Sequence, residues 1–283
     1  MGLEGELELS DEVLVYIINK FTCEPGVRKL KEILFEIIGE INLKLLGPDV
    51  MNDTTGNDIT NIKKITIEDV KNVYLKDRRE VREKEIPSES KVGVMNGLWA
   101  NALGMGGLIP IEAQFRLATN KLDLKLTGMQ GDVMKESMSV ALSLAWSKTP
   151  FDRQKALLTQ FSDTSLQGVH IHCPEGAVPK DGPSAGTAIT VALFSLFNNV
   201  KINNEVAITG EMSLQGRVTA IGGLDLKILG GIRAGVKRFL FPKENEKEFN
   251  DFQEKYGKKD IVDGISFHMI ETIDEALSLA LCR

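Results

Sequence analysis

The sequence predicts an α+β protein in two parts, a small helical region over residues 1–75 and a mixed α/β domain over residues 92–283. Three observations favour this class. Apolar residues in the first region follow three- and four-residue steps, the period of a helix that is buried on one face. Residues 76–91 are strongly charged and then rich in Pro and Ser, as in a linker. Beyond them, short apolar runs alternate with longer helical patterns.

The first region is expected to begin with two helices. Ser10 is a favourable helix cap, and Asp11 and Glu12 place negative charge at the positive end of the helix dipole. Pro25 suits the first turn of the second helix. The apolar face of that helix consists of Val27, Leu30, Ile33, Leu34, Ile37, Ile38, Ile41 and Leu45.

Three further elements complete the first region. Gly47-Pro48 is expected to end the long helix, because proline cannot continue it. A polar loop over residues 52–61 follows. A short strand over 64–67 and a helix over 68–75 then close the region.

The second domain is expected to alternate strands with helices. Asp132, Asn245 and Thr272 are favourable caps for three of its helices. Gly222-Gly223 is expected to open the helix that carries Lys227. The expected strands cover residues 109–117, 122–127, 169–172, 206–209, 218–221, 238–241 and 265–270.

Composition excludes several classes of protein. The chain has 283 residues, 42% of them hydrophobic, with a formal net charge of −6, so it is globular and lacks the basic character of a nucleic-acid-binding protein. No apolar run approaches the length of a membrane helix, and the acidic N-terminus does not resemble a signal peptide. We expect neither nucleic acid nor a membrane as partner. The few cysteines, Cys23, Cys173 and Cys282, favour a reducing compartment, the cytoplasm or an organelle matrix, rather than secretion.

The most informative segment is Pro179-Lys180-Asp181-Gly182-Pro183-Ser184-Ala185-Gly186. It places Ser184 among small residues, directly before an apolar run over 188–194 that predicts a helix. A helix N-terminus behind a glycine-containing loop offers backbone N–H groups that can hold an oxyanion. The structural alternative is a serine near a helix cap after a turn, which is common.

A serine nucleophile needs a base, and the chain has three histidines, His170, His172 and His268. Residues 182–186 match the G-x-S-x-G pattern of an α/β-hydrolase elbow, in which His268 would be the base. An elbow, however, turns directly from a strand into a helix. Here a long loop with several prolines separates the predicted strand from Ser184, which argues against a hydrolase.

Lys227 is the other candidate base. An ammonium cannot accept a proton, so its pKa must fall from roughly 10.4 toward roughly 7–8 by burial or hydrogen bonding. Thr209, at the end of a predicted buried strand, is placed to hydrogen-bond the amine. An exposed lysine and an ordinary strand threonine are the structural alternatives. The neighbours of Lys227 are apolar: Ile221, Leu224, Leu226, Ile228 and Leu229.

His170, His172 and Cys173 raise the question of a metal site. Residues two apart on a strand share one face, so the two histidines lie together, whereas Cys173 points to the other face. The sequence has no second cluster of cysteine and histidine. We therefore expect no metal, and structural histidines instead.

Several ordered motifs resemble the C-terminal part of Lon-type ATP-dependent proteases. They cover residues 126–128, 131–137, 170–186, 209–211, 221–224 and Lys227. A further segment, Phe21-Thr22-Cys23-Glu24-Pro25-Gly26-Val27-Arg28, resembles the start of a helix in the small lid subdomain of that family's AAA+ module. The resemblance thus implies an AAA+ lid followed by a charged linker and a Lon-type proteolytic domain.

The resemblance also implies roles for individual residues. Ser184 would be the nucleophile and Lys227 the general base, with Thr209 supporting the lysine. Asp181 and Gly182 would shape the loop that controls access to Ser184. These groups need no cofactor for peptide-bond hydrolysis.

For the complete protease, the resemblance implies a homo-hexamer that unfolds proteins with ATP and Mg²⁺. Arg28 would sense ATP in a complete ATPase module. This chain has no G-x-x-x-x-G-K-[ST] loop, so we expect no ATPase activity from it alone. Its expected substrates are unfolded or damaged polypeptides.

Two points are left open by the sequence. The family usually has Gly-Leu-Ala-Trp-Thr before Gly-Gly. In this chain Trp99 is shifted, and extra residues precede Gly106-Gly107. We expect this segment to form a loop that borders the substrate cleft. The competing function is a degenerate, non-catalytic protein that binds peptides as a scaffold. Labelling of Ser184 by a covalent serine probe distinguishes the two functions.

Overall fold

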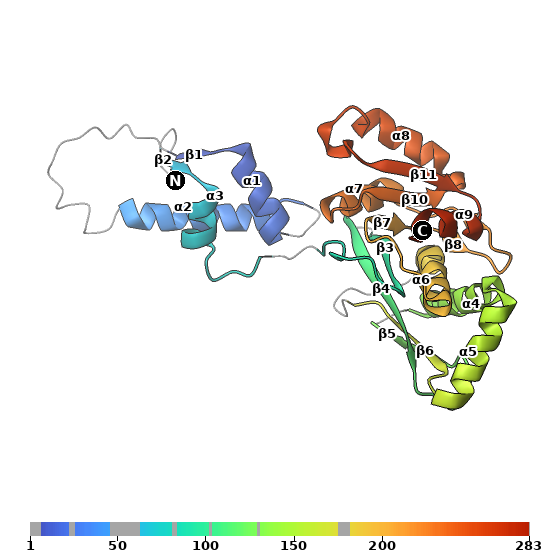
Figure 1. The fold of residues 1–283 in the computed structure, drawn as a ribbon. Helices are drawn as coiled ribbons and strands as arrows, with labels where there is room; N and C mark the ends of the chain where they lie inside the picture. The colour runs from blue at the N-terminus through green and yellow to red at the C-terminus, as the bar shows by residue number, and fades with distance from the viewer. Residues whose placement is uncertain are drawn as a thin grey trace. The chain divides into compact units, whose positions relative to one another are not determined.

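The computed structural model describes residues 7–22, 26–45, 63–80, 84–101, 104–128, 131–174 and 182–282. The chain divides into two compact units, Met1–Arg82 and Glu83–Arg283, which are described separately (Figure 1). Helices and a mixed β-sheet confirm the predicted α+β class. Within the described ranges, no helix combines the length and apolar character that crossing a membrane requires.

The N-terminal unit packs helices against a two-stranded parallel sheet. Ser10 caps the first helix as predicted, since its hydroxyl accepts the Val13 N–H at 3.5 Å. Pro25, Gly47-Pro48 and the predicted loop over 52–61 lie outside the described residues. The elements are β1 (Leu7–Leu9), α1 (Asp11–Ile17), a π-helical turn (Ile18–Thr22), α2 (Arg28–Leu45), β2 (Lys63–Ile65), α3 (Ile67–Asp69) and a second π-helical turn (Val70–Tyr74).

The predicted apolar face of α2 forms part of the core of this unit. Ile33, Ile37 and Ile41 are each at most 1% exposed. Val27, which the sequence placed on the same face, precedes the helix and is 70% exposed, so that assignment was wrong.

The C-terminal unit is built on a seven-stranded sheet in the order β11-β10-β7-β3-β4-β6-β5. Neighbouring strands run parallel except at the β3–β4 and β4–β6 pairs, which are antiparallel. A separate antiparallel pair consists of β8 and β9. The strands are β3 (Val94–Ala100), β4 (Gly106–Arg116), β5 (Leu124–Thr127), β6 (Gly168–His172), β7 (Val206–Ile208), β8 (Glu211–Met212), β9 (Val218–Thr219), β10 (Arg238–Pro242) and β11 (Ser266–Ile270).

Helices cover both faces of this sheet (Figure 1). Alternate residues of β10 show why: Leu240 belongs to the core cluster with α4, α5, α6 and α9, whereas Phe239 and Phe241 pack with α7 and α8 on the other face. The helices are α4 (Asp132–Lys148), α5 (Phe151–Thr164), α6 (Gly186–Asn198), α7 (Leu224–Arg233), α8 (Glu246–Tyr256) and α9 (Ile273–Ala280).

Several details of the predicted elements were wrong or missing. Strand β3 was not predicted, and the part of it around Trp99 was expected to be a loop; it is a central strand between β4 and β7. Helix α5 was not predicted either. Gly131, not Asp132, precedes the first turn of α4, so Asp132 is the first helical residue. Asn245 precedes α8, but its side chain does not cap that helix.

The backbone of α7 lies directly against the start of β4. A Cβ added at Gly230 would lie 2.3 Å from the carbonyl carbon and oxygen of Gly106. The Arg233 guanidinium also donates to the Gly106 carbonyl, at 2.9 Å. Because no side chain separates the two backbones, α7 has little freedom to shift or rotate on the sheet.

Gly230→Ala should therefore destabilise the C-terminal unit, by about 1–3 kcal/mol or more, because a backbone contact cannot yield as a side chain can. Urea denaturation measures the loss. Gly39→Ala is the matched control: nothing lies within 4 Å of its added Cβ on α2. That substitution should stabilise its helix by about 0.5–1 kcal/mol. Equal effects of the two substitutions would contradict the close packing.

Candidate active site

Ser184 lies in a single 3₁₀ turn, Pro183–Ala185, that leads directly into α6. Its side chain is half-buried, whereas the first residues of α6 are fully buried. Beneath the turn, the buried Ser137 of α4 donates a long hydrogen bond of 3.4 Å to the Pro183 carbonyl. The serine is thus held on a short, supported turn at a helix N-terminus. Asp181 lies outside the described residues.

Gly210 fixes this turn to the end of β7. Its N–H donates to the Ser184 carbonyl at 2.8 Å, and its own carbonyl accepts from the Thr187 N–H at 3.1 Å and the Thr187 hydroxyl at 2.9 Å. A Cβ added at Gly210 would lie 2.6 Å from a methyl group of Val218 on β9 and 2.7 Å from the Thr187 hydroxyl oxygen on α6. A larger residue at position 210 would therefore have to push these side chains away.

Thr209 connects Ser184 to Lys227. Its hydroxyl donates to the Ser184 carbonyl at 3.3 Å and accepts a hydrogen bond from Lys227 Nζ at 3.2 Å. A hydroxyl has one proton, so Thr209 can only accept from the lysine once that proton is directed at Ser184. A neutral Lys227 amine that donates one N–H to Thr209 keeps its lone pair available for another proton.

Lys227 is buried, with 3% of the residue exposed. It belongs to the first turn of α7, where its N–H bonds to the Gly223 carbonyl at 3.1 Å. Burial lowers the pKa of the Lys227 amine from 10.5 to about 8, and the negative charge of Glu248 opposes part of that shift. A substantial fraction of Lys227 is therefore neutral under mildly alkaline conditions, which a general base requires.

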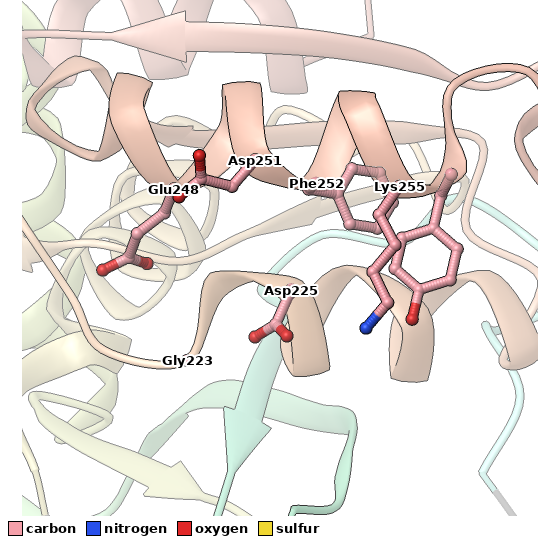
Figure 2. Close-up of a pocket in the computed structure, with 7 residues that line it drawn as sticks. Gly223, Asp225, Glu248, Asp251, Phe252 and Lys255 are labelled. Atoms are coloured by element: carbon pink, nitrogen blue, oxygen red, sulfur yellow. The ribbon is translucent and has the colours of Figure 1, made fainter.

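An open groove of about 370 Å³ lies between α7 and α8. Figure 2 shows Asp225 on α7 and Glu248 and Asp251 on α8 around this α7–α8 groove. The carboxylate of Glu248 is exposed, so solvent screens its effect on Lys227. Burial consequently dominates the pKa of the lysine.

The structure brings three of the predicted residues together. Ser184, Thr209 and Lys227 belong to one hydrogen-bonded chain that passes through the Thr209 hydroxyl. In the described part of the protein, no hydrogen bond joins Ser184 Oγ directly to Lys227 Nζ. The direct contact through which Ser184 would pass its proton to Lys227 is therefore part of the proposed mechanism.

The histidines have other partners. Thr127 Oγ1 lies 2.9 Å from His170 Nε2 and 2.7 Å from His172 Nδ1, so both rings share one face of β6 as predicted. His268 belongs to the edge strand β11, opposite Leu240. Burial and the charge of Arg238 lower its pKa. Among the described residues, none of these rings hydrogen-bonds Ser184, and no cluster of three or more His, Cys, Asp or Glu residues is arranged to hold a metal ion.

Comparison with known proteins identifies the family. A family profile described as "Lon protease (S16) C-terminal proteolytic domain" matches residues 64–283. The chain belongs to this Lon protease family. It is 35% identical to a "Lon protease" of Finegoldia magna over 98% of this chain, and 36% identical to a "Lon protease" of Methanosarcina barkeri over 99% of it. "Lon protease 1" of Bacillus subtilis is 35% identical over 98% of the chain.

The chain spans about a third of the length of these Lon relatives, between 32% and 33%. The aligned part includes the N-terminal unit, where Arg28 is the first residue of α2. The Arg28 side chain is 89% exposed and pairs with Glu32 at 3.2 Å.

Two residues of this Lon-type site were missed or misassigned from the sequence. Gly210 was noticed only as part of a motif, although a glycine at a strand end often marks a close backbone approach. Asn245 was taken for a helix cap, yet its amide group bonds to the backbone of Ile221. Nothing in the local sequence indicates that distant partner.

Lys227→Met should make the protein more stable near neutral pH. The folded pKa of Lys227, about 8, lies below its unfolded value, so the unfolded state binds more protons between about pH 8 and 10.5. The free energy of unfolding of the wild type therefore rises with pH across that window. Lys227→Met has no titrating amine at this position, so its free energy of unfolding lacks this rise. At about pH 7 the variant should be more stable by an amount on the order of a few kcal/mol.

Urea denaturation from about pH 7 to about pH 10.5 measures this difference, which should shrink as the pH rises. Lys247→Met on the exposed surface of α8 is the control for the same substitution at a solvent-exposed position. A Lys227→Met variant that is less stable than wild type at every pH would contradict a desolvated amine.

Proposed function

We propose that this chain is a serine endopeptidase domain in which Ser184 is the nucleophile and Lys227 is the general base. One observation carries the proposal: a lysine with a pKa of about 8 is buried beside a serine turn and linked to it through Thr209. A low-pKa amine next to a serine is a known variant of the arrangement of serine hydrolases. The family membership of the chain supports the same reaction.

In the proposed mechanism, the Ser184 hydroxyl attacks the carbonyl carbon of a peptide bond while its proton passes to the neutral Lys227 amine. The tetrahedral intermediate then collapses, and the leaving amine takes the proton from the lysine. Lys227 next removes a proton from water, which hydrolyses the acyl-enzyme and restores Ser184. Thr209 keeps the lysine amine in place through both steps.

The oxyanion is proposed to bind to backbone N–H groups of the serine turn. Within the described turn, the Gly186 N–H bonds to the Pro183 carbonyl and the Thr187 N–H bonds to the Gly210 carbonyl, so both are occupied. Pro183 has no N–H group. The proposed donors are therefore the N–H groups of Gly182, Ser184 and Ala185, each worth roughly 2.7–4 kcal/mol when correctly aimed.

The role of the chain in a longer protein is also a proposal. We infer that residues 1–75 are the AAA+ lid, that 76–91 are a linker, and that ATP and Mg²⁺ act on a part of the longer relatives that this chain does not cover. Arg28, exposed at the start of α2, would then face nucleotide in a complete module. The proposed substrates are unfolded polypeptides, delivered to a homo-hexamer in a reducing compartment, the cytoplasm or an organelle matrix. The relatives' names support a protein substrate.

Ser184→Ala should abolish cleavage of a fluorogenic unfolded protein, and Lys227→Ala should reduce it by roughly 10²–10⁴-fold, the usual contribution of a general base. The wild-type rate should rise with pH and level off above about pH 8, where Lys227 becomes neutral. Initial rates without ATP, at several pH values, test this. Lys247→Ala is the control for loss of a lysine charge.

Activity that survives in Lys227→Ala would contradict the proposed base. The competing scaffold function makes the opposite prediction for a covalent serine probe: folded wild-type protein would not react with it, whereas the peptidase should be labelled at Ser184 and Ser184→Ala should not.

Thr209→Val should lower kcat roughly 10- to 100-fold, because it removes two hydrogen bonds that orient the lysine amine and the serine turn. Thr209→Ser is the matched variant, since it keeps the hydroxyl and should retain most of the activity. Steady-state kinetics of both variants measure the difference. A large loss in Thr209→Ser with little loss in Thr209→Val would show that the methyl packing of Thr209, and not its hydroxyl, matters.

A further inference from the structure

Asn245 makes an unusual contact for a residue at the start of a helix. It ends the short 3₁₀ turn Lys243–Asn245 before α8, where an asparagine normally caps the helix with its side chain. Here the side chain is turned away from α8 and buried, with 3% of the residue exposed. Its amide N–H donates to the Ile221 carbonyl at 2.7 Å, and its amide oxygen accepts the Ile221 N–H at 3.0 Å.

These two bonds hold both polar backbone groups of a single residue, as a neighbouring β-strand would. The preceding residue is held from the same turn, because the Glu244 carboxylate accepts the Ala220 N–H at 2.9 Å. Glu244 is exposed, whereas Asn245 and Ile221 are buried. Asn245 therefore provides the part of this clamp that solvent does not screen.

The clamped residue is followed directly by the start of the lysine helix. Only Gly222 and Gly223 separate Ile221 from α7, and Gly223 has a left-handed φ of 68°. Two glycines leave the chain free to adopt many conformations unless its ends are fixed. The Gly223 carbonyl in turn accepts the Lys227 N–H, so the position of this peptide sets the turn of helix that carries the lysine.

The other parts of α7 have independent supports. Its middle lies against Gly106 through Gly230, and its C-terminal end accepts a hydrogen bond from the Ile86 N–H to the Ala234 carbonyl at 2.9 Å. Gly106 also lies against the first turn, since a Cβ added at Gly106 would lie 2.1 Å from the Leu226 carbonyl oxygen, so packing on β4 supports this turn from one side. Among the described contacts, the Asn245–Ile221 pair is the buried side-chain hydrogen-bond anchor of the segment that leads into this turn.

We propose that Asn245 is a positioning residue for Lys227, which keeps the first turn of α7 in the place where the lysine amine is buried against Thr209. The inference rests on the proposed function of Lys227 as the general base. Asn245 does not touch the reacting groups; it acts through Ile221 and the two glycines. Loss of the clamp should let the first turn fray and admit water to the amine.

The test is a titration of Lys227 by lysine side-chain NMR in the full chain, with the Lys227 signal assigned from its loss in Lys227→Ala. In Asn245→Ala the Lys227 pKa should rise from about 8 toward its ordinary value, by a unit or more, as water reaches the amine. Each unit lowers the neutral fraction about tenfold near neutral pH, so kcat should fall about tenfold or more with KM little changed. The pH at which the rate levels off should rise by the same amount.

Asn198→Ala is the matched control. Asn198 also makes two side-chain hydrogen bonds, to Thr149 and to the Phe194 carbonyl, but at the C-terminal end of α6. Asn198→Ala should destabilise the C-terminal unit without changing the pKa of Lys227. An Asn245→Ala protein with the wild-type Lys227 pKa and kcat would overturn the proposal, because Asn245 would then be a structural residue only.

A second variant covers the case in which Asn245→Ala does not fold. Asn245→Asp has nearly the same shape and keeps an oxygen that accepts the Ile221 N–H, but its carboxylate cannot donate to the Ile221 carbonyl. It should show an intermediate rise of the Lys227 pKa, and wild-type behaviour would overturn the proposal. The titration does not depend on catalysis, so activity surviving in Lys227→Ala would count against the proposed base, whereas an unchanged Lys227 pKa counts against the clamp.

Discussion

The burial of a single amine is the constraint on which the rest of this site depends. A lysine normally keeps its charged end in water, and α7 holds Lys227 away from water by lying with its backbone on β4. The direct contact between Gly230 and Gly106 leaves no space for the helix to tilt. Because of this dry setting, the lysine is close enough to neutral to accept a proton, and the proposed chemistry needs no histidine.

The second requirement is that the serine turn and Lys227 keep a fixed position relative to each other. Both are fastened to the two residues that follow β7: Gly210 holds the Ser184 carbonyl, and Thr209 bonds to that carbonyl and to the lysine. Strand β7 lies between β10 and β3 in the sheet, and the Thr209 N–H just beyond its end bonds to the Leu240 carbonyl of β10 at 3.1 Å, so this end is anchored to a neighbouring strand. The site therefore takes its precision from the sheet.

The sequence alone predicted the strands and helices that lie beside distinctive local motifs. Ser184, Thr209 and Lys227 stand in motifs with distinctive neighbours, and the strand and helix around each were predicted close to their observed bounds. Strand β3 was missed because Asn96 and Gly97 interrupt the alternation that marks a strand, although the strand is buried in the middle of the sheet. The role of Asn245 depends on Ile221, 24 residues earlier, and no local pattern reveals such a pair.

The distances along the chain have a consequence for the time at which activity appears. Thr209 lies 25 residues after Ser184 and 18 before Lys227, and the strands beside it come from both ends of the domain. Because contacts between distant residues require the intervening loops to close, this arrangement is complete only when the segments between these residues are in place. On the proposed function, a growing or partly folded copy of this chain would hold the residues of a peptidase without their arrangement. It would therefore not cut itself during synthesis, at the stage when the chain is the kind of unfolded polypeptide that the finished domain is proposed to cut.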